Sequence, residues 1–187
     1  FYNFRVCGRE TLRGFSIGYP PGRTNGRGFS YTGAAKEVRR STMAFSDREL
    51  LARLIQCEAG GEGDTGMKAV AGVVMNRVNA RGGEYARVGQ GSIRSIIFQP
   101  YQFVCASETE GGAYNPQNIY NMRPEQIHYD IADWAIAGNR IPDVAESLWF
   151  YNPFGPSCRS FFPSDVGYWQ TRIGDHCFYN PTNAYYK

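Results

Sequence analysis

The sequence predicts an α+β fold in which a mostly helical domain is completed by a small antiparallel sheet. Two patterns carry this prediction. Between residues 46 and 139, apolar residues recur at the spacing of amphipathic helices, and glycine or proline interrupts each run. From residue 148 onward the runs are short, aromatic or β-branched, and they are separated by Asn-Pro, Gly-Pro and Gly-Asp. Such runs are typical of strands joined by turns.

Length and charge favour one domain and exclude some functions. The chain has 187 residues, of which 42% are hydrophobic, and this is enough for one well-buried core. A net charge of +3 without a basic block does not indicate nucleic-acid binding, although it would suit a polyanionic wall polymer. No run approaches the roughly eighteen apolar residues of a membrane span. We therefore expect no nucleic-acid partner and no membrane span.

Residues 1–44 differ in composition from the rest of the chain. They are rich in Gly, Arg, Tyr and Phe and contain Y-P-P-G at Tyr19–Gly22. Pro-Pro and repeated glycine interrupt both helical and strand periodicity, so this region is predicted to be an arm or linker. Its aromatic residues favour packing on the domain or on a partner. The predicted domain organisation is therefore an arm at 1–44 and a folded domain at 45–187.

The first helix is predicted from its start signals. Ser46 followed three residues later by Glu49 is a capping box, and Phe45 with Leu50 forms the matching hydrophobic staple. A helix is expected to begin here, with an apolar stripe through Leu51, Leu54 and Ile55.

Glu58 is the next position on this stripe, seven residues after Leu51. A buried carboxylate without partners costs several kcal/mol, so it either pairs or holds a proton at a raised pKa. Gly60 and Gly61 are expected to end the helix and to open space beside the side chain. The pattern predicts a general acid in a cleft. The alternative is a structural glutamate that is solvated or pairs with Arg77.

Two further helices are predicted in the next forty residues. One begins with an N-cap between residues 63 and 66 and ends at Gly82-Gly83, with a stripe of Met67, Val70, Ala71, Val74 and Val78. It should pack against the first helix as a tight pair. A shorter helix spans 92–98 with three isoleucines inward, and Pro100 stops it.

The region from 99 to 139 is predicted to contain two loops and one helix. Residues 99–103, Q-P-Y-Q-F, carry amides and aromatic rings suited to sugar hydroxyls and ring faces, although the same composition is common in turns. The polar residues 104–122 are expected to form a long surface loop, one wall of a groove. A helix then opens at Pro124 in its first turn and ends at Gly138-Asn139, with its apolar face formed by Ile127, Ile131, Trp134 and Ala135.

The cysteines and histidines do not form a recognisable metal motif. The five cysteines lack a C-x-x-C pair, and only two histidines are present, so we expect neither a metal nor a cofactor. A Cys57 nucleophile paired with His176 remains an alternative. Cys158 and Cys177 flank turns and are predicted to form a disulfide between two segments of the sheet. Cys57 and Cys105 are a second candidate pair.

Several stretches of this chain occur together, in the same order, in one known family. They are C-E-A-G-G-E-G at Cys57–Gly63, A-V-A-G-V-V-M-N-R-V at Ala69–Val78, I-F-Q-P-Y-Q-F at Ile97–Phe103, W-F-Y-N-P at Trp149–Pro153 and I-G-D-H-C-F-Y at Ile173–Tyr179. Through them, about residues 46–179 resemble the SleB/CwlJ-type cell wall hydrolases, the spore cortex-lytic enzymes of germinating bacteria. The pair Cys158 and Cys177 is more similar to the CwlJ branch.

The resemblance implies cleavage of peptidoglycan glycan strands at the bond between N-acetylmuramic acid and N-acetylglucosamine. It also implies a fold related to lysozyme and to lytic transglycosylases, and a location outside the cell or in the spore coat or cortex. Glu58 falls at the position of the catalytic acid. The predicted substrate-binding residues are Glu62, Gln99, Phe103, Tyr151 and His176. Residues 1–44 are expected to offer a surface for a spore-coat or accessory protein.

The expected chemistry follows from the supply of carboxylates. A glycoside hydrolase needs a second carboxylate near the acid, and the nearby candidates are Glu62 and Asp64. Glycines separate Glu62 from Glu58, so it is expected to point away from the sugar or to fix the loop. A single acid can still act by lytic transglycosylation, because the muramic C6 hydroxyl is a tethered nucleophile. The alternatives are an inactive wall-binding or spore-coat protein and a cysteine peptidase or amidase using Cys57.

Overall fold

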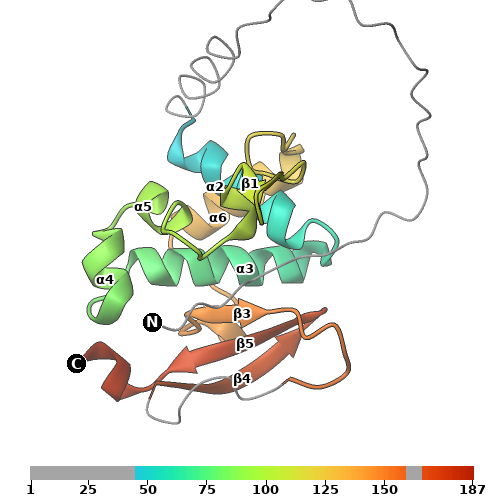
Figure 1. Ribbon diagram of the computed structural model, residues 1–187. Helices are drawn as coiled ribbons and strands as arrows, with labels where there is room; N and C mark the ends of the chain where they lie inside the picture. The colour runs from blue at the N-terminus through green and yellow to red at the C-terminus, as the bar shows by residue number, and fades with distance from the viewer. Residues whose placement is uncertain (1–44, 159–165) are drawn as a thin grey trace, which may run out of the picture. The chain divides into compact units, whose positions relative to one another are not determined.

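Helix α3 (Gly63–Val78) lies at the centre of the part of the chain that the computed structural model describes, residues 45–158 and 166–187 (Figure 1). Helices α2 (Asp47–Ala59), α5 (Ile93–Ile97) and α6 (Gln126–Ile136) pack against it, and a three-stranded sheet covers its other side. Eleven of its sixteen residues are buried, because it is covered from both sides. The predicted arm at 1–44 lies outside the described residues. None of the helices in the described ranges is sufficiently long and apolar to cross a membrane.

The sheet is antiparallel, as the aromatic runs predict. Its strands are β3 (Trp149–Tyr151), β4 (Gly167–Ile173) and β5 (His176–Pro181), in the order β3-β5-β4. In the register, Phe150 faces Phe178 across β3 and β5. All residues of the central strand β5 are buried, and its apolar run Cys177–Tyr179 is flanked by the buried polar residues His176 and Asn180. The α+β prediction is therefore confirmed.

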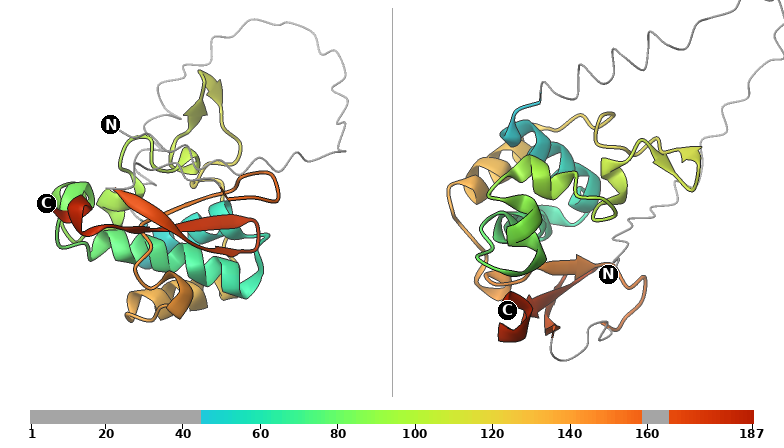
Figure 2. Two further views of the ribbon diagram at one scale, coloured as in Figure 1. Left: turned by 90° about the horizontal axis from the view of Figure 1, so that it is seen from below. Right: turned by 60° about the vertical axis from the view of Figure 1, so that its left-hand side comes forward.

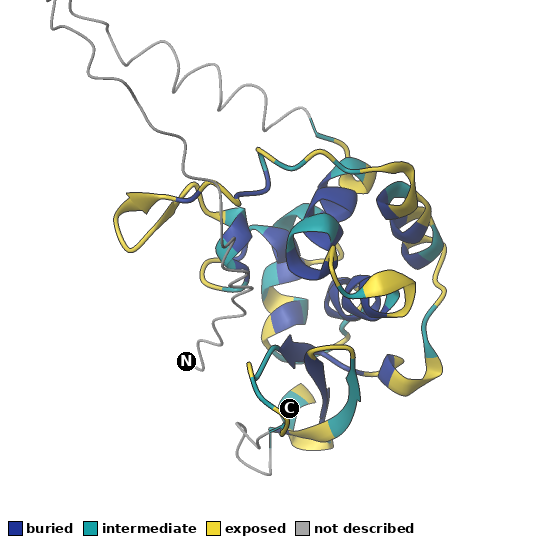
Figure 3. Ribbon diagram, turned by 90° about the vertical axis from the view of Figure 1, so that its right-hand side faces the viewer, coloured by how far each residue is buried: buried dark blue, intermediate teal, exposed yellow. Residues whose placement is uncertain are grey.

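The segment after α5 differs from the long surface loop predicted for 104–122. It contains the short helix η1 (Val104–Ala106) and a hairpin of β1 (Thr109–Glu110) and β2 (Ala113–Tyr114) that projects from the helices (Figure 2). The hairpin is exposed (Figure 3). The buried Asn115 amide ties its base together by donating to the carbonyls of Val104 and Ser107, at 3.3 and 3.1 Å. The sequence pattern missed this order because side-chain bonds to the backbone, rather than periodicity, create it.

Two helix boundaries also differ from the prediction. Helix α3 ends at Val78 rather than at Gly82-Gly83, and that glycine pair instead begins an unpredicted helix, α4 (Gly83–Gly89). The reason is tertiary packing. A Cβ at Gly82 would lie 2.7 Å from the Tyr186 carbonyl oxygen in η3 (Asn183–Tyr186), so the pair allows α4 to pack against the C-terminal segment. The N-cap of α3 is Glu62, one residue earlier than expected.

The start of α6 is another correction. Pro124 precedes the N-cap Glu125 instead of lying in the first turn, and Ile127, predicted to be buried, is 40% exposed. His128 takes the buried position, and its Nδ1 accepts a 3.0 Å hydrogen bond from the Glu125 backbone N–H. The capping bond at this end therefore selects the rotation of the helix that buries the histidine.

Helix α2 begins and ends close to the predicted residues. Ser46 Oγ accepts from the Glu49 N–H at 3.2 Å, and Gly60 caps the other end. A capping box also requires the Glu49 side chain to accept from the backbone N–H of Ser46. Here the Glu49 carboxylate instead accepts from Arg53 and Tyr129. Leu51, Leu54 and Ile55 are fully buried, so the stripe that contains Glu58 faces the core.

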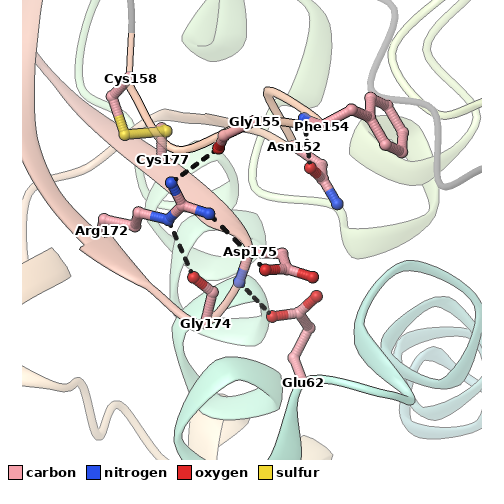
Figure 4. Close-up of a disulfide and its surroundings, with 9 residues drawn as sticks. All are labelled: Glu62, Asn152, Phe154, Gly155, Cys158, Arg172, Gly174, Asp175 and Cys177. Atoms are coloured by element: carbon pink, nitrogen blue, oxygen red, sulfur yellow. Dashed lines mark hydrogen bonds and ion pairs between the residues drawn. A yellow bond between two sulfur atoms is a disulfide. The ribbon is translucent and has the colours of Figure 1, made fainter.

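A disulfide joins Cys158 to Cys177 on β5, with Cα atoms 5.8 Å apart, and this prediction is confirmed (Figure 4). Arg172 on β4 adds a polar link between the same segments, because its guanidinium donates to the Gly155 carbonyl at 2.9 Å. It also donates to the Gly174 carbonyl at 3.1 Å within the hairpin. The chain that follows β3 is therefore attached to the β4–β5 hairpin by the disulfide and by the Arg172–Gly155 hydrogen bond.

Candidate active site

Glu58 lies in the last turn of α2 with only 8% of its surface exposed. Its two carboxyl oxygens have different surroundings. Oε1 accepts a hydrogen bond from Cys105 Sγ at 3.1 Å, whereas Oε2 is buried and has no partner among the described residues. A buried polar atom without a partner costs free energy, and such atoms are common where a ligand completes the site.

The surroundings of Glu58 favour its protonated form. Burial raises the pKa of the carboxyl group from 4.5 to about 7, although the Cys105 hydrogen bond and the positive charge of Arg77 both act to lower it. The side chain therefore carries a proton for a substantial fraction of the time at neutral pH. This is the state that a general acid needs before it reacts.

Arg77 on α3 is close enough to influence Glu58 but does not form an ion pair with it. No such pair within 4.0 Å joins the two side chains in the described part of the protein, where Arg77 Nε instead donates to the Leu148 carbonyl at 2.7 Å. The guanidinium is 1% exposed and lies over the rings of Tyr85 and Phe103, 4.7 and 5.2 Å from their centroids. The alternative of an Arg77-paired structural glutamate is therefore not supported.

Two thiols flank Glu58. The donor atoms of Cys57, Glu58 and Cys105 all lie within 4.8 Å of one another, and they are the described side chains that could share a soft metal ion. Metal binding requires a deprotonated thiol. Burial, together with neighbouring Cys57 and Glu58, raises the pKa of the Cys105 thiol well above its usual value, which opposes that step. Cys57 is half-buried, and its Sγ donates to the Gln117 carbonyl at 3.1 Å.

Two of the predicted substrate-binding residues, Glu62 and His176, meet each other. Glu62 Oε2 accepts from the Asp175 N–H at 2.7 Å (Figure 4). Its Oε1 lies 3.5 Å from His176 Nδ1. That 3.5 Å contact does not meet the geometry of a hydrogen bond. His176 is 4% exposed between Phe150 and Phe178, and burial lowers its pKa, so the ring is mostly neutral. In this arrangement Glu62 attaches the α2–α3 corner to the β4–β5 turn.

Glycines allow Glu62 to reach this position. A Cβ on Gly66 would collide with Glu62 Cβ, and a Cβ on Gly174 would collide with Glu62 Oε2. Gly174 also has φ +57°, a left-handed conformation that favours glycine. The Glu62 side chain therefore lies between the backbone of α3 and that of the β4–β5 turn.

The other predicted groove residues are buried. Gln99 Nε2 donates to Glu84 Oε1 at 3.2 Å, while its own Oε1 is buried without a partner among the described residues. Phe103 is 2% exposed and packs on Phe150, with ring centroids 6.4 Å apart. Tyr151 on β3 is 9% exposed and packs on Tyr179 at 5.8 Å. These contacts give the three residues packing roles, and substrate contact by them stays a prediction.

The sequence interpretation missed two features near the predicted loop. The sequence predicts Cys105 only as a candidate disulfide partner, although its Sγ donates to Glu58 Oε1. Tyr101 is 75% exposed with φ +66°, whereas Phe103 two residues later is in the core. The left-handed backbone at Tyr101 reverses the local direction of the chain, so the exposed ring of the loop is Tyr101.

A surface cavity of about 510 Å³ lies in a different place from Glu58. It is lined by the C-terminal end of α3 and by residues around β3, β5 and η3: Asn76, Asn79, Ala80, Arg81, Ala145, Glu146, Leu148, Pro181, Asn183 and Tyr186. Glu58 and Cys105 are not among these residues. Because no titratable group in this lining has the environment of Glu58, we assign the candidate chemistry to the buried acid.

The fold and the site together define a class: a mostly helical α+β domain that carries a buried, protonatable glutamate at the end of a helix. Comparison of the sequence with known families is more specific. The chain belongs to the cell wall hydrolase family, whose profile matches residues 61–179. The matched range begins three residues after Glu58, so the role of Glu58 depends on the geometry described above.

Individual relatives agree with this family. The chain is 33% identical to the cell wall hydrolase CwlJ of Halalkalibacterium halodurans, over 74% of this chain and 87% of that protein. It is also 33% identical to CwlJ of Bacillus subtilis, over 78% and 91%. The catalytic domain of the germination-specific lytic transglycosylase SleB from Bacillus anthracis has a similar structure, with a TM-score of 0.50 and 24% identity. The similarity to SleB covers 72% of this chain and 96% of that domain and shows a common fold.

Proposed function

We propose that this protein cleaves the glycan strands of spore-cortex peptidoglycan between N-acetylmuramic acid and N-acetylglucosamine, by lytic transglycosylation with Glu58 as acid and base. One observation carries the proposal: Glu58 is buried, has a pKa raised to about 7, and keeps one oxygen without a partner among the described residues. Membership of the cell wall hydrolase family supports the choice of polymer. The names of the relatives, cell wall hydrolase CwlJ and germination-specific lytic transglycosylase SleB, support a wall polymer degraded in germination and the reaction type.

In the first step, Glu58 Oε2 donates its proton to the glycosidic oxygen that leaves with N-acetylglucosamine. The C1–O bond breaks, and positive charge develops at C1 of the muramic ring. Cys105 Sγ holds Oε1, so the two carboxyl oxygens keep distinct orientations. Arg77 stabilises the carboxylate that remains, because its positive charge lowers the pKa of Glu58.

In the second step, the muramic C6 hydroxyl attacks C1 and gives its proton to the Glu58 carboxylate. The products are a 1,6-anhydromuramic end, a free N-acetylglucosamine end and a reprotonated Glu58. A tethered nucleophile has a large orientational advantage, and it requires no positioned water molecule.

The positions of the neighbouring carboxylates support a route with a single acid. Glu62 contacts the Asp175 N–H and His176 through its two oxygens. Asp64 is exposed and pairs with Lys68 at 2.6 Å. Either carboxylate would have to break its existing contacts before it could activate water. A hydrolase needs a second carboxylate that is free to do so.

The test is product analysis on purified cortex peptidoglycan. We expect muropeptides with 1,6-anhydromuramic ends from the wild type, and Glu58→Gln should lower the rate by roughly a hundredfold to ten-thousandfold. The amide keeps the volume of the side chain but cannot deliver a proton. Asp64→Asn is the matched control, because it makes the same change from carboxyl to amide at an exposed residue and should leave the rate unchanged. Near wild-type turnover by Glu58→Gln would exclude the assignment, and reducing muramic ends alone would return Glu62 or Asp64 to the role of second carboxylate.

The same assay separates the two other functions considered. Polymer that is bound but intact would indicate an inactive wall-binding protein, and cut peptide stems would indicate an amidase or peptidase. The contacts of Cys57 argue against the latter, because its Sγ donates to a backbone carbonyl and His176 Nδ1 faces Glu62. Action on cortex would place the protein outside the cell or in the spore, where residues 1–44 could contact a coat or accessory protein.

A further inference from the structure

Cys57 and Cys105 form a thiol pair directly beside Glu58 that the proposed reaction does not use. Cys57 comes from the last part of α2 and Cys105 from η1, and both are free cysteines. Their sulfur atoms lie within 4.8 Å of each other and of a Glu58 carboxyl oxygen. A disulfide needs an S–S distance of about 2.05 Å, so closing the pair requires side-chain rotation and movement of the η1 segment.

We propose that Cys57 and Cys105 are a thiol modification site for low-molecular-weight disulfides, and that closure of a Cys57–Cys105 disulfide changes how Glu58 holds its proton. The first half of the proposal depends only on the two thiols. The second half rests on the proposed function of Glu58.

The exposure of the two thiols sets the order of the steps. Cys57 is half-buried and can be reached from solvent, whereas Cys105 is 4% exposed. The Cys57 thiolate attacks the small disulfide, forms a mixed disulfide and releases one small thiol. Cys105 Sγ then attacks Cys57 Sγ and releases the second small thiol. The small disulfide is reduced to two thiols as the two cysteines are oxidised, so electrons and atoms balance.

Glu58 takes part in the second exchange through its contact with Cys105. The Cys105 S–H group points at Glu58 Oε1, 3.1 Å away, so the carboxylate accepts the proton as the sulfur attacks. Burial opposes the formation of a free thiolate at Cys105. Because Glu58 accepts the proton during the attack, no free thiolate has to form first. The resting contact is therefore arranged for the resolving step.

Closure should raise the proton affinity of Glu58. Three groups surround this carboxyl: Cys105 from η1, Arg77 from α3 and Cys57 beside it on α2. The Cys105 hydrogen bond lowers the pKa of Glu58, and a disulfide sulfur has no proton to donate. Its loss leaves burial opposed by Arg77 alone, so the pKa rises and the protonated acid persists to higher pH.

Peptide mapping tests the modification itself. The protein is treated with excess oxidised glutathione in the presence of a chelator, in a Cys7→Ser background that leaves Cys57 and Cys105 as its free thiols. We expect a linked peptide containing both residues, lighter by two hydrogens than the two reduced peptides. Cys57→Ser should yield no such link. Stable glutathione on Cys57 without linkage, or no reaction at either thiol, would overturn the proposal.

The rate profile tests the coupling to Glu58. Oxidation should move the alkaline limb of rate against pH upward by about half a unit to one unit, the effect of losing one hydrogen bond to a carboxylate. Cys57→Ser keeps the Cys105 donor and should show no oxidant response. An unchanged limb in the fully linked protein would refute the coupling. The Glu58→Gln variant separates failure of this proposal from failure of the proposed function. If that variant is active, Glu58 is not the catalytic acid, but the peptide-mapping result still stands.

Discussion

Glu58 combines an ionisable carboxyl group with a buried position on the core-facing stripe of a helix, and these two properties usually oppose each other. Its burial costs less when the group is protonated, and the site moderates that cost with one thiol donor and one buried arginine. The result is a carboxyl group that titrates near neutral pH. Both predictions at the residue scale follow from this property.

The rate of cleavage should fall as pH rises through about 7, because the proton donor is lost as Glu58 ionises. Activity measured between pH 5 and 9 on solubilised glycan strands would show this alkaline limb. Cys105→Ala removes the donor to Oε1 and should move the limb to higher pH. A flat profile across this range in the wild type would contradict the role of Glu58.

The stability of the fold should also report the pKa of Glu58. The folded pKa, about 7, is raised above the ordinary 4.5, so the stabilising contribution is complete below 4.5 and is lost as pH rises to about 7. Glu58→Gln does not titrate. Its stability relative to the wild type should therefore increase by up to about 3 kcal/mol between pH 4 and pH 8. Urea unfolding at both pH values measures the difference, and an equal gap at both would contradict a raised pKa.

At the scale of elements, the α2–α3 corner is attached to the β4–β5 turn through Glu62. This contact joins residues 113 positions apart, Glu62 and Asp175, and depends on the absence of a side chain at Gly174. The corner also contains the end of α2, where Glu58 lies. The attachment therefore links the C-terminal end of α2, through the corner, to the sheet.

Gly174→Ala should destabilise the protein more than Gly111→Ala does. The two glycines have nearly equal φ values, +57° and +58°, so backbone strain is matched, but only Gly174 would place its new Cβ against Glu62. The extra cost should be about 1–3 kcal/mol, as for other overpacked sites. Thermal unfolding measures both variants. The difference should disappear in a Glu62→Ala background, and equal costs in the wild-type background would exclude the contact.

The Cys158–Cys177 disulfide should stabilise the sheet by about 3 kcal/mol, because it closes a loop with a sequence separation of 19 residues. Cys158→Ser should lower the midpoint of urea unfolding, and a reductant should lower that of the wild type to a similar value. The variant itself should not respond to the reductant. Persistence of the wild-type midpoint after complete reduction would show that the bond contributes little.

At the scale of the whole molecule, α3 is the common support of the helical layer and the sheet. The buried hydrophobic residues of the described chain all lie between Leu50 and Tyr179. They come from both layers, and α3 contacts each (Figure 1). The core is therefore a single unit in which Glu58 and the disulfide lie in different layers.

A fragment of residues 45–187 should fold with thermal stability close to that of the whole chain, because the buried hydrophobic residues of the described chain, from Leu50 to Tyr179, all lie within it. It should also cleave soluble glycan strands at a similar rate. Differential scanning calorimetry and the product assay, applied to the fragment and to residues 1–187, make the comparison. An unfolded fragment would instead place part of the core in the arm.

Much of this protein follows from local sequence patterns. Periodicity alone predicts α2, α3, α5 and the antiparallel sheet, because apolar spacing reports which face of an element is buried. The same reasoning identifies Glu58, since a charged residue on an apolar stripe is buried whatever it contacts. Cys158 and Cys177 could also be paired, because each flanks a turn between aromatic runs.

Other features required the tertiary structure, because periodicity does not encode which distant residue meets a buried face. Cys105 contacts Glu58 across 47 positions, and Glu62 meets His176 across the α2–α3 corner. Tyr101, rather than Phe103, is the exposed ring of its loop because the backbone of Tyr101 is left-handed. Helix α4 depends on packing against Tyr186. The sequence therefore determined the acid and the layers around it, and long-range packing decided the partners that set its proton affinity.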